Sequence, residues 1–395
     1  MVHLKSIGAG VIGAFAAIGL AQGADLGVKK PSAAEYVKTC PTYGSGFFVV
    51  PGTTSCLKVL GRVRADYMIE NPTTNATNAN RFRVRGYVAF DHRTATEYGL
   101  LRTFVRAYFQ RENAADTTVL EQAFIQFGGI TAGRVTPLWE HGWSPWFAGS
   151  NNYGGYSFIL YTNTIGYTAK LGSGFSATLA IEDSRERIRG LTGGTVAGTR
   201  VPDIVGSLDY AGSFGALKLM GALHEIRSTA PNIDATYGYA IGAAGKINLP
   251  FASKGTNLWF NAVLTEGAVS YAGYNTIAIG SFSRAAVDAT VAGGKARLTR
   301  AWTLAGGVQA YLTPTIWTSL GGSYAQYDPS GAANTLKTYA LVGQVGWQPT
   351  AGFLIGAEVF YRKIDGPAAT ITAGFGTRGN DTADWVGRLR FQRDF

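Results

Sequence analysis

The stretch that decides the fold is residues 82–90, Phe-Arg-Val-Arg-Gly-Tyr-Val-Ala-Phe, in which apolar character repeats every second residue. In an extended strand, one face then carries Phe82, Val84, Gly86, Val88 and Phe90. The same order of aromatic, apolar, small, apolar and aromatic residues recurs in segments 339–347 and 353–361. At ~3.3 Å per residue such a face extends about 26 Å, or ~20 Å of height at a tilt near 40°. This height suits the lipid-facing band of a barrel membrane protein, with its aromatic girdles at both rims.

The opposite face of these strands is strongly basic. Seven arginines alternate with apolar residues on the first three strands and define what we call the basic wall: Arg62, Arg64, Arg81, Arg83, Arg85, Arg102 and Arg106. An arginine that faced lipid at mid-membrane would cost about 2 to 4 kcal/mol, so this face is expected to contact water. A closed barrel with a water-filled lumen satisfies both faces and leaves no unpaired backbone edge in the hydrocarbon.

The alternating pattern can be followed through sixteen strands, beginning near residues 56, 81, 99, 119, 130, 164, 174, 203, 214, 236, 256, 300, 314, 338, 352 and 384. Short connections alternate with long ones such as 137–163, 184–202, 268–299 and 365–382. Short turns on one side and long loops on the other are typical of outer-membrane barrels. The sequence therefore predicts an all-β, sixteen-stranded antiparallel transmembrane β-barrel over residues 56–395.

Composition disfavours other classes of protein. Charged residues make up only 15% of the 395 residues, against roughly 25% on average, and 53 residues are glycine, which argues against an ordinary soluble enzyme. Beyond residue 23, no run of 18 apolar residues lacks a charge or turn signal, which argues against membrane-spanning helices. The net charge of +10 comes from basic residues that fall on the predicted lumen face, so nucleic acid is not an expected partner. No glycine loop that could cradle a phosphate follows a strand and opens a helix, so no cofactor is expected.

The N-terminal residues 1–23 have the features of a signal peptide: Lys5, an apolar run from Ile7 to Leu20, and small residues at Ala21 and Gly23. A short membrane anchor is the alternative. The mature chain would then comprise an N-terminal segment, residues 24–55, followed by the barrel. In an exported chain, the even count of two cysteines, Cys40 and Cys56, favours a disulfide bond, with two free thiols as the alternative. Their spacing does not suit a metal site.

The last strand ends on an aromatic residue. Its apolar face carries Trp385, Gly387, Leu389 and Phe391, and the chain ends at Phe395. A final strand that ends in phenylalanine resembles the signal by which the barrel assembly machinery recognises bacterial outer-membrane proteins. Arg393 departs from that signal, which usually has an apolar residue at this position.

Several stretches resemble the porins of alphaproteobacterial outer membranes along nearly the whole mature chain. The most specific are 35–40 (Glu-Tyr-Val-Lys-Thr-Cys), 43–48 (Tyr-Gly-Ser-Gly-Phe-Phe), 51–53, 56–58, 123–129 (Ala-Phe-Ile-Gln-Phe-Gly-Gly), 131–134, 202–206 and 246–250. The resemblance implies a homotrimeric pore in outer-membrane lipid for passive diffusion of small hydrophilic solutes. It also implies a bridged cysteine pair and a third external loop that folds into the lumen.

By this strand count, the third external loop is 137–163, the expected place of the constriction. The loop is rich in aromatic residues and contains a single acid; its candidate constriction residues are Trp139, Glu140, Trp143, Trp146, Tyr153 and Tyr156. A basic wall opposite a loop with little acid predicts a preference for anions. Two alternatives stay open: the arginines pair with Asp66, Asp91 and Glu70 and set no selectivity, or the loop aromatics pack against the barrel. If they instead form a stacking track, the channel would select sugars or aromatic solutes.

Two other functions compete with a diffusion channel. An enzyme needs a nucleophile, a base and an orienting group within reach. Of the histidines beyond residue 23, His92, His141 and His224, only His224 is expected near a loop rim, beside Glu225, so catalysis is not expected. An adhesive role is the second, with a long loop such as 268–299 acting as a surface receptor for phage or host.

Overall fold

The computed structural model describes residues 38–70, 78–143, 147, 157, 160–274, 276–279, 282–329, 335–366 and 381–395. The predicted signal peptide, Trp146, Tyr153 and Tyr156 lie outside these residues. The chain is all-β, and no helix in the described part is long and apolar enough to cross a membrane.

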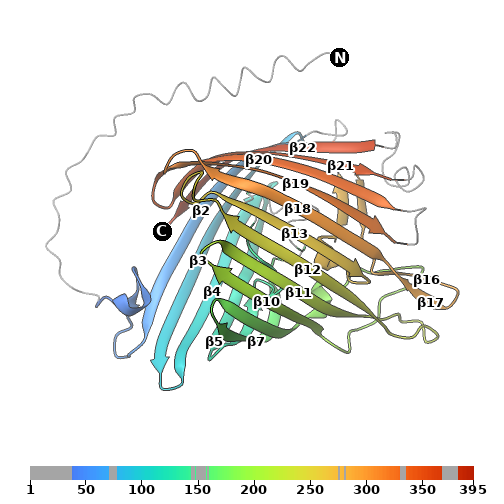
Figure 1. The fold of residues 1–395 in the computed structure, drawn as a ribbon, viewed down its shortest axis with the longest axis horizontal. Coiled ribbons are helices and arrows are strands. Elements are labelled where there is room, and N and C mark those ends of the chain that lie inside the picture. The colour runs from blue at the N-terminus through green and yellow to red at the C-terminus, as the bar shows by residue number, and fades with distance from the viewer. Residues whose placement is uncertain are drawn as a thin grey trace, which may run out of the picture. The chain divides into compact units, whose positions relative to one another are not determined.

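Sixteen antiparallel strands form a closed barrel, as the sequence predicts (Figure 1). They are β2 (Cys56–Glu70), β3 (Asn80–Thr96), β4 (Gly99–Glu112), β5 (Ala115–Phe127), β6 (Ile130–Val135), β7 (Thr162–Gly172), β8 (Phe175–Glu182), β10 (Asp203–Gly212), β11 (Gly215–Ile226), β12 (Thr236–Asn248), β13 (Asn257–Glu266), β18 (Arg300–Tyr311), β19 (Ile316–Asp328), β20 (Leu336–Thr350), β21 (Phe353–Asp365) and β22 (Asp381–Asp394). The barrel closes where β22 pairs with β2, from Arg62 opposite Asp394 to Glu70 opposite Val386.

Smaller elements lie outside the barrel wall. Strand β1 (Phe48–Val49) pairs with β2 and, with the 3₁₀ turn η1 (Pro41–Tyr43), belongs to the N-terminal segment; there Cys40 and Cys56 form the disulfide that the sequence favours. The connections contain η2 (Ser184–Glu186), β9 (Leu191–Thr192), η3 (Val269–Ala272), β14 (Thr276–Ile279), β15 (Phe282–Ala285), β16 (Ala289–Ala292) and β17 (Lys295–Leu298).

The period of two places apolar side chains on the outside of the barrel. Phe82, Leu341 and Val359 are 68%, 58% and 59% exposed, respectively, in the isolated chain. Exposed side chains of this size are stable only against an apolar medium, because in water they would form one continuous apolar patch. The wall is therefore the lipid-facing surface that the alternation predicts.

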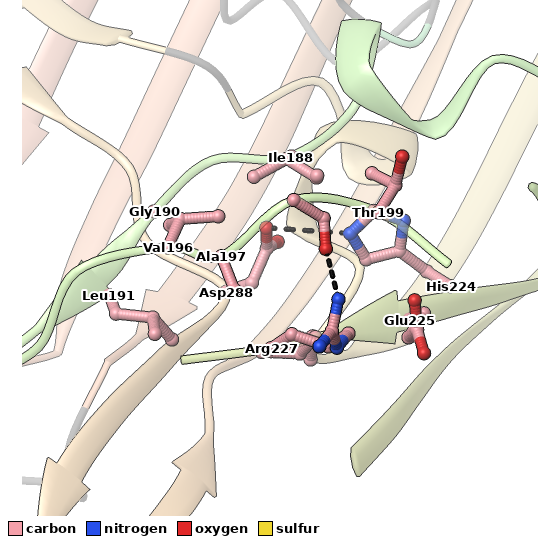
Figure 2. Close-up of a pocket in the computed structure, with 12 residues that line it drawn as sticks. Ile188, Gly190, Leu191, Val196, Ala197, Thr199, His224, Glu225, Arg227 and Asp288 are labelled. Carbon is pink, nitrogen blue, oxygen red and sulfur yellow. Dashed lines mark hydrogen bonds and ion pairs between the residues drawn. The ribbon is translucent and has the colours of Figure 1, made fainter. Parts of the chain in front are cut away.

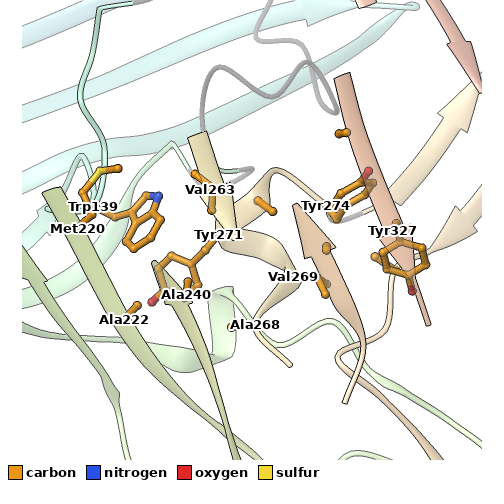
Figure 3. Packing of buried hydrophobic residues seen from close by; sticks show 14 of the residues in the cluster. Trp139, Met220, Ala222, Ala240, Val263, Ala268, Val269, Tyr271, Tyr274 and Tyr327 are labelled. Atoms are coloured by element: carbon orange, nitrogen blue, oxygen red, sulfur yellow. The ribbon is translucent and has the colours of Figure 1, made fainter. Parts of the chain in front are cut away.

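Two loops enter the barrel: the one between β6 and β7 and the one between β13 and β18. The first is the predicted inward loop, and its Trp139 is only 2% exposed. The adhesive alternative would place the second at the surface, whereas η3, at its start, is wholly buried. The residues of η3 pack on an inner wall of small side chains that includes Ala222, Ala240 and Ala301 (Figure 3). The small side chains at these positions leave room for a loop inside the barrel, and the outward-facing pattern does not reveal this.

Candidate functional site

The structure places all seven arginines of the basic wall on the inner face of β2, β3 and β4. Cross-strand pairing sets them side by side: Arg64 lies opposite Arg85, and Asp66 lies opposite Arg83. Their neighbours in sequence face outward, as the 51% exposure of Val63 and the 50% exposure of Val84 show. The alternation of side chains along a strand thus sets both faces at once.

Six of the seven arginines have a carboxylate within 4.0 Å. The pairs are Arg62 with Asp394 (2.5 Å), Arg64 with Asp66 (3.6 Å), Arg81 with Glu70 (2.5 Å) and Glu112 (2.8 Å), Arg83 with Asp66 (2.7 Å), Arg102 with Asp91 (3.0 Å), and Arg106 with Glu121 (2.5 Å). Most of the wall is therefore paired, in agreement with the alternative in which acids of the wall neutralise it.

Pairing is incomplete around Asp66. This buried carboxylate is shared by Arg64, Arg83 and Arg390, the last at 2.6 Å. Arg85, beside Arg64, has no carboxylate within 4.0 Å among the described residues. Its guanidinium instead donates to Gln110 Oε1 at 2.8 Å and to the Tyr87 hydroxyl at 2.9 Å.

Three guanidinium groups share Asp66, and Arg85 beside them has no carboxylate of its own, so these five groups together carry a formal net charge of +3. Arg390 was not among the predicted site residues. The sequence does indicate that Arg390 faces inward, because Arg388 and Arg390 alternate with the apolar residues of the last strand. What the sequence could not show is that barrel closure brings this strand against β2.

The tip of the β6–β7 loop reaches the wall formed by β19, β21 and β22. The Phe147 amide donates to Glu358 at 3.0 Å, and its carbonyl accepts from Arg388 at 2.7 Å and Arg390 at 2.9 Å. The Phe147 ring packs edge-on against Trp317, with ring centroids 5.6 Å apart. Gly356 faces this ring, and a Cβ at Gly356 would collide with Cζ of Phe147. The loop that follows β6 is therefore held at residue 147 by strands on another side of the barrel.

The other described aromatic residues of this loop contact protein. Trp139 packs edge-on against Tyr271 of η3, with ring centroids 4.8 Å apart (Figure 3). Trp143 packs on the same buried cluster. Tyr161 accepts a hydrogen bond from Arg106 at 2.8 Å, and burial raises the pKa of Tyr161 to about 12. Trp139, Trp143 and Tyr161 thus anchor the loop to the barrel.

The predicted acid of the constriction, Glu140, has its carboxylate in the protein interior. Its Oε1 accepts from the Ser157 amide at 3.1 Å and from the Ser157 hydroxyl. Burial raises the pKa of Glu140 to about 7. Ser157 in turn accepts from Arg187, which is fully buried and lies 3.9 Å from the Tyr271 ring centroid. Glu140 therefore forms a contact within its own loop instead of facing the basic wall, and Ser157 connects that loop to Arg187 in the connection between β8 and β10.

A second buried ionic group holds the β13–β18 loop. Asp203 accepts from the Tyr271 hydroxyl at 2.7 Å and lies 2.7 Å from His224 Nδ1. Figure 2 shows Asp288 of this loop beside His224, and the two side chains are 3.7 Å apart. Asp288 also accepts from the amides of Val269 and Arg189. His224 thus has a structural partner on each side. In the described part of the chain, no cluster of three or more residues could hold a metal ion.

Comparisons with known proteins agree with this architecture. The family model described as Porin subfamily matches residues 25–386. The Porin Omp2b of Brucella neotomae and that of Brucella abortus (strain 2308) are each 29% identical to the chain over 413 aligned positions, which cover the whole of both proteins. The outer membrane channel DcaP of Acinetobacter baumannii superimposes with a TM-score of 0.69 at 15% identity, over 88% of this chain and 99% of that one. The anion-selective porin from Comamonas acidovorans gives a TM-score of 0.56 at 13% identity, over 86% and 100%.

Proposed function

The chain belongs to the Porin subfamily, and on that premise we propose that it passes small hydrophilic solutes by diffusion with a preference for anions. Family membership makes it a channel of the bacterial outer membrane and not an enzyme. The proposal adds the sign of the selectivity and its origin in the basic wall.

One observation carries the proposed anion preference: the unbalanced charge around Asp66. Three guanidinium groups, those of Arg64, Arg83 and Arg390, share this single carboxylate. A fourth, that of Arg85, lies opposite Arg64 and has no carboxylate within 4.0 Å among the described residues. A lumen lined by one sign of charge concentrates counter-ions and repels co-ions. The other arginines of the wall add less: Arg62, Arg81 and Arg106 each have a carboxylate partner, and Arg102 shares Asp91 with Arg93.

The test is the zero-current potential of the reconstituted protein across a tenfold KCl gradient. An ideally selective pore would give about 59 mV, and we expect a smaller value with the sign of anion preference. The variant Arg85→Gln removes a charge that has no carboxylate partner, so the potential should fall. The matched control, Arg185→Gln, removes an exposed loop arginine paired with Asp183 and should leave the potential unchanged. A wild-type potential of zero, or of the opposite sign, would refute the preference.

We further propose that the chain is exported by residues 1–23, assembles through the outer-membrane barrel machinery and forms a homotrimer. The proposal rests on the N-terminal pattern, the terminal Phe395 and the family resemblance. Chemical cross-linking of the protein extracted from membranes would give a band at three times the monomer mass. A monomer alone would refute the trimer.

A further inference from the structure

A hollow in the inner wall lies beside the unbalanced arginines. It is lined by side chains of β2, β3 and β4 together with the end of the chain: Leu60, Gly61, Arg62, Tyr87, Ala89, Phe104, Arg106, Asp394 and Phe395. Arg62 and Arg106 flank it, and each already holds a carboxylate, Asp394 and Glu121 respectively. These two arginines therefore frame the hollow without leaving a free charge in it.

The floor of the hollow is apolar and partly aromatic. Tyr87 and Phe104 are each 8% exposed, and Ala89 between them is 4% exposed. Each ring is held by another aromatic ring: Tyr87 lies 5.4 Å from Tyr108, and Phe104 stacks at 5.3 Å on Phe124. The accessible parts of these rings, with Leu60 and Ala89, line the hollow with apolar surface that suits a flat apolar group.

The excess positive charge lies next to Tyr87, at one edge of this apolar floor. The guanidinium carbons of Arg64 and Arg85 lie 5.6 and 5.7 Å, respectively, from the Tyr87 ring centroid. Nε of Arg64 faces Asp66 at 3.6 Å, beyond hydrogen-bond distance, and the Arg64 side chain is 12% exposed. The two arginines are cross-strand partners, so both can reach one anionic group.

We propose that the lumen contains a binding site for small organic anions with a flat apolar body, of the aromatic carboxylate class. The carboxylate would bind at Arg64 and Arg85, and the ring would lie over Tyr87 toward Phe104. The site rests on the proposed function, because the anion must enter the pore to reach it. Acetate lacks the body and benzamide lacks the charge, so neither should occupy the site well.

The test is block of single-channel current by benzoate in potassium acetate. Benzoate should reduce the wild-type conductance in a saturable way, whereas benzamide, or further acetate, should not. In Phe104→Leu, which keeps the apolar volume and every charge, the half-blocking benzoate concentration should rise about tenfold. Arg85→Gln should raise it by at least as much, and Arg185→Gln should leave it unchanged.

The two proposals fail separately. An anion-preferring channel in which benzoate acts no differently from acetate would overturn the site and leave the anion preference intact. Equal block by benzamide and benzoate, or block that is unchanged in Phe104→Leu, would also overturn it. A channel without anion preference in the KCl gradient would refute the proposed function first. Since Phe104→Leu retains the whole basic wall, its zero-current potential should match that of the wild type. Such a match would show that the variant is folded and forms an open channel.

Discussion

Replacing Phe147 by alanine should release the tip of the β6–β7 loop from the barrel wall. The ring is 8% exposed, lies 4.8 Å from the guanidinium of Arg390 and packs edge-on against Trp317. Truncation of a buried phenylalanine to alanine costs about 3 to 5 kcal/mol. The main-chain hydrogen bonds of residue 147 to Glu358, Arg388 and Arg390 need no side chain, so we take the lower figure. At 1.4 kcal/mol per factor of ten, a loss of about 3 kcal/mol raises the ratio of released to docked loop roughly a hundredfold.

Single-channel recording would detect the released loop as a noisier current with a larger mean conductance. The matched control is Phe251→Ala, which makes the same chemical change at a side chain that is 85% exposed on a short turn. Phe251→Ala should resemble the wild type. If Phe147→Ala inserts into bilayers and conducts with wild-type noise and amplitude, the loop is not held by this ring and the reasoning fails.

Three further predictions concern the loops and the chain ends. The pKa of Glu140 is raised from 4.5 to about 7, so loop docking should be strongest below roughly pH 4.5 and weaken as pH rises through about 7; current noise should follow this course and become independent of pH in Glu140→Gln. Reduction of the Cys40–Cys56 bond, which spans 16 positions, should lower the free energy of unfolding by about 3 kcal/mol, and an unchanged denaturant midpoint would contradict this. Deletion of Phe395 removes two main-chain hydrogen bonds to Gly61, so the fraction of folded barrel in membranes, measured by heat-dependent gel mobility, should fall.

The strands and the side that each residue faces could be predicted from sequence because both follow from local alternation. The predicted first strand begins at Cys56, as does β2, and β10 and β18 likewise begin at the predicted residues 203 and 300. The largest difference is at β5, which begins at Ala115 and not near residue 119. Its polar start, Ala-Asp-Thr-Thr, lies beyond the apolar band and carries no alternation.

The partners of the basic wall could not be predicted, because they depend on how the barrel closes. Asp66 and Arg390 are separated by 324 positions and meet only where β22 joins β2. The environment of Glu140 could not be predicted either. Its place in an aromatic loop suggests an exposed acid of the constriction, yet its carboxylate hydrogen-bonds to Ser157 in the interior. A single sequence does not distinguish these two environments.

The size of the inward-facing residues explains why the two halves of the barrel differ. On β11, β12, β18 and β19 the inner positions include Ala222, Ala240, Ala301 and Ala325, and the inserted loops occupy the space that these small side chains leave. On β2, β3 and β4 the inner positions carry arginines, whose length and charge do not permit such packing.

The aqueous path is therefore expected to follow the basic wall. At physiological salt, charges are screened over about 8 Å. An ion confined to this side would therefore pass within reach of the excess positive charge around Asp66, whereas one at the centre of an empty barrel would not. The loops that fill one half thereby make a small excess of charge on the other half sufficient to select ions.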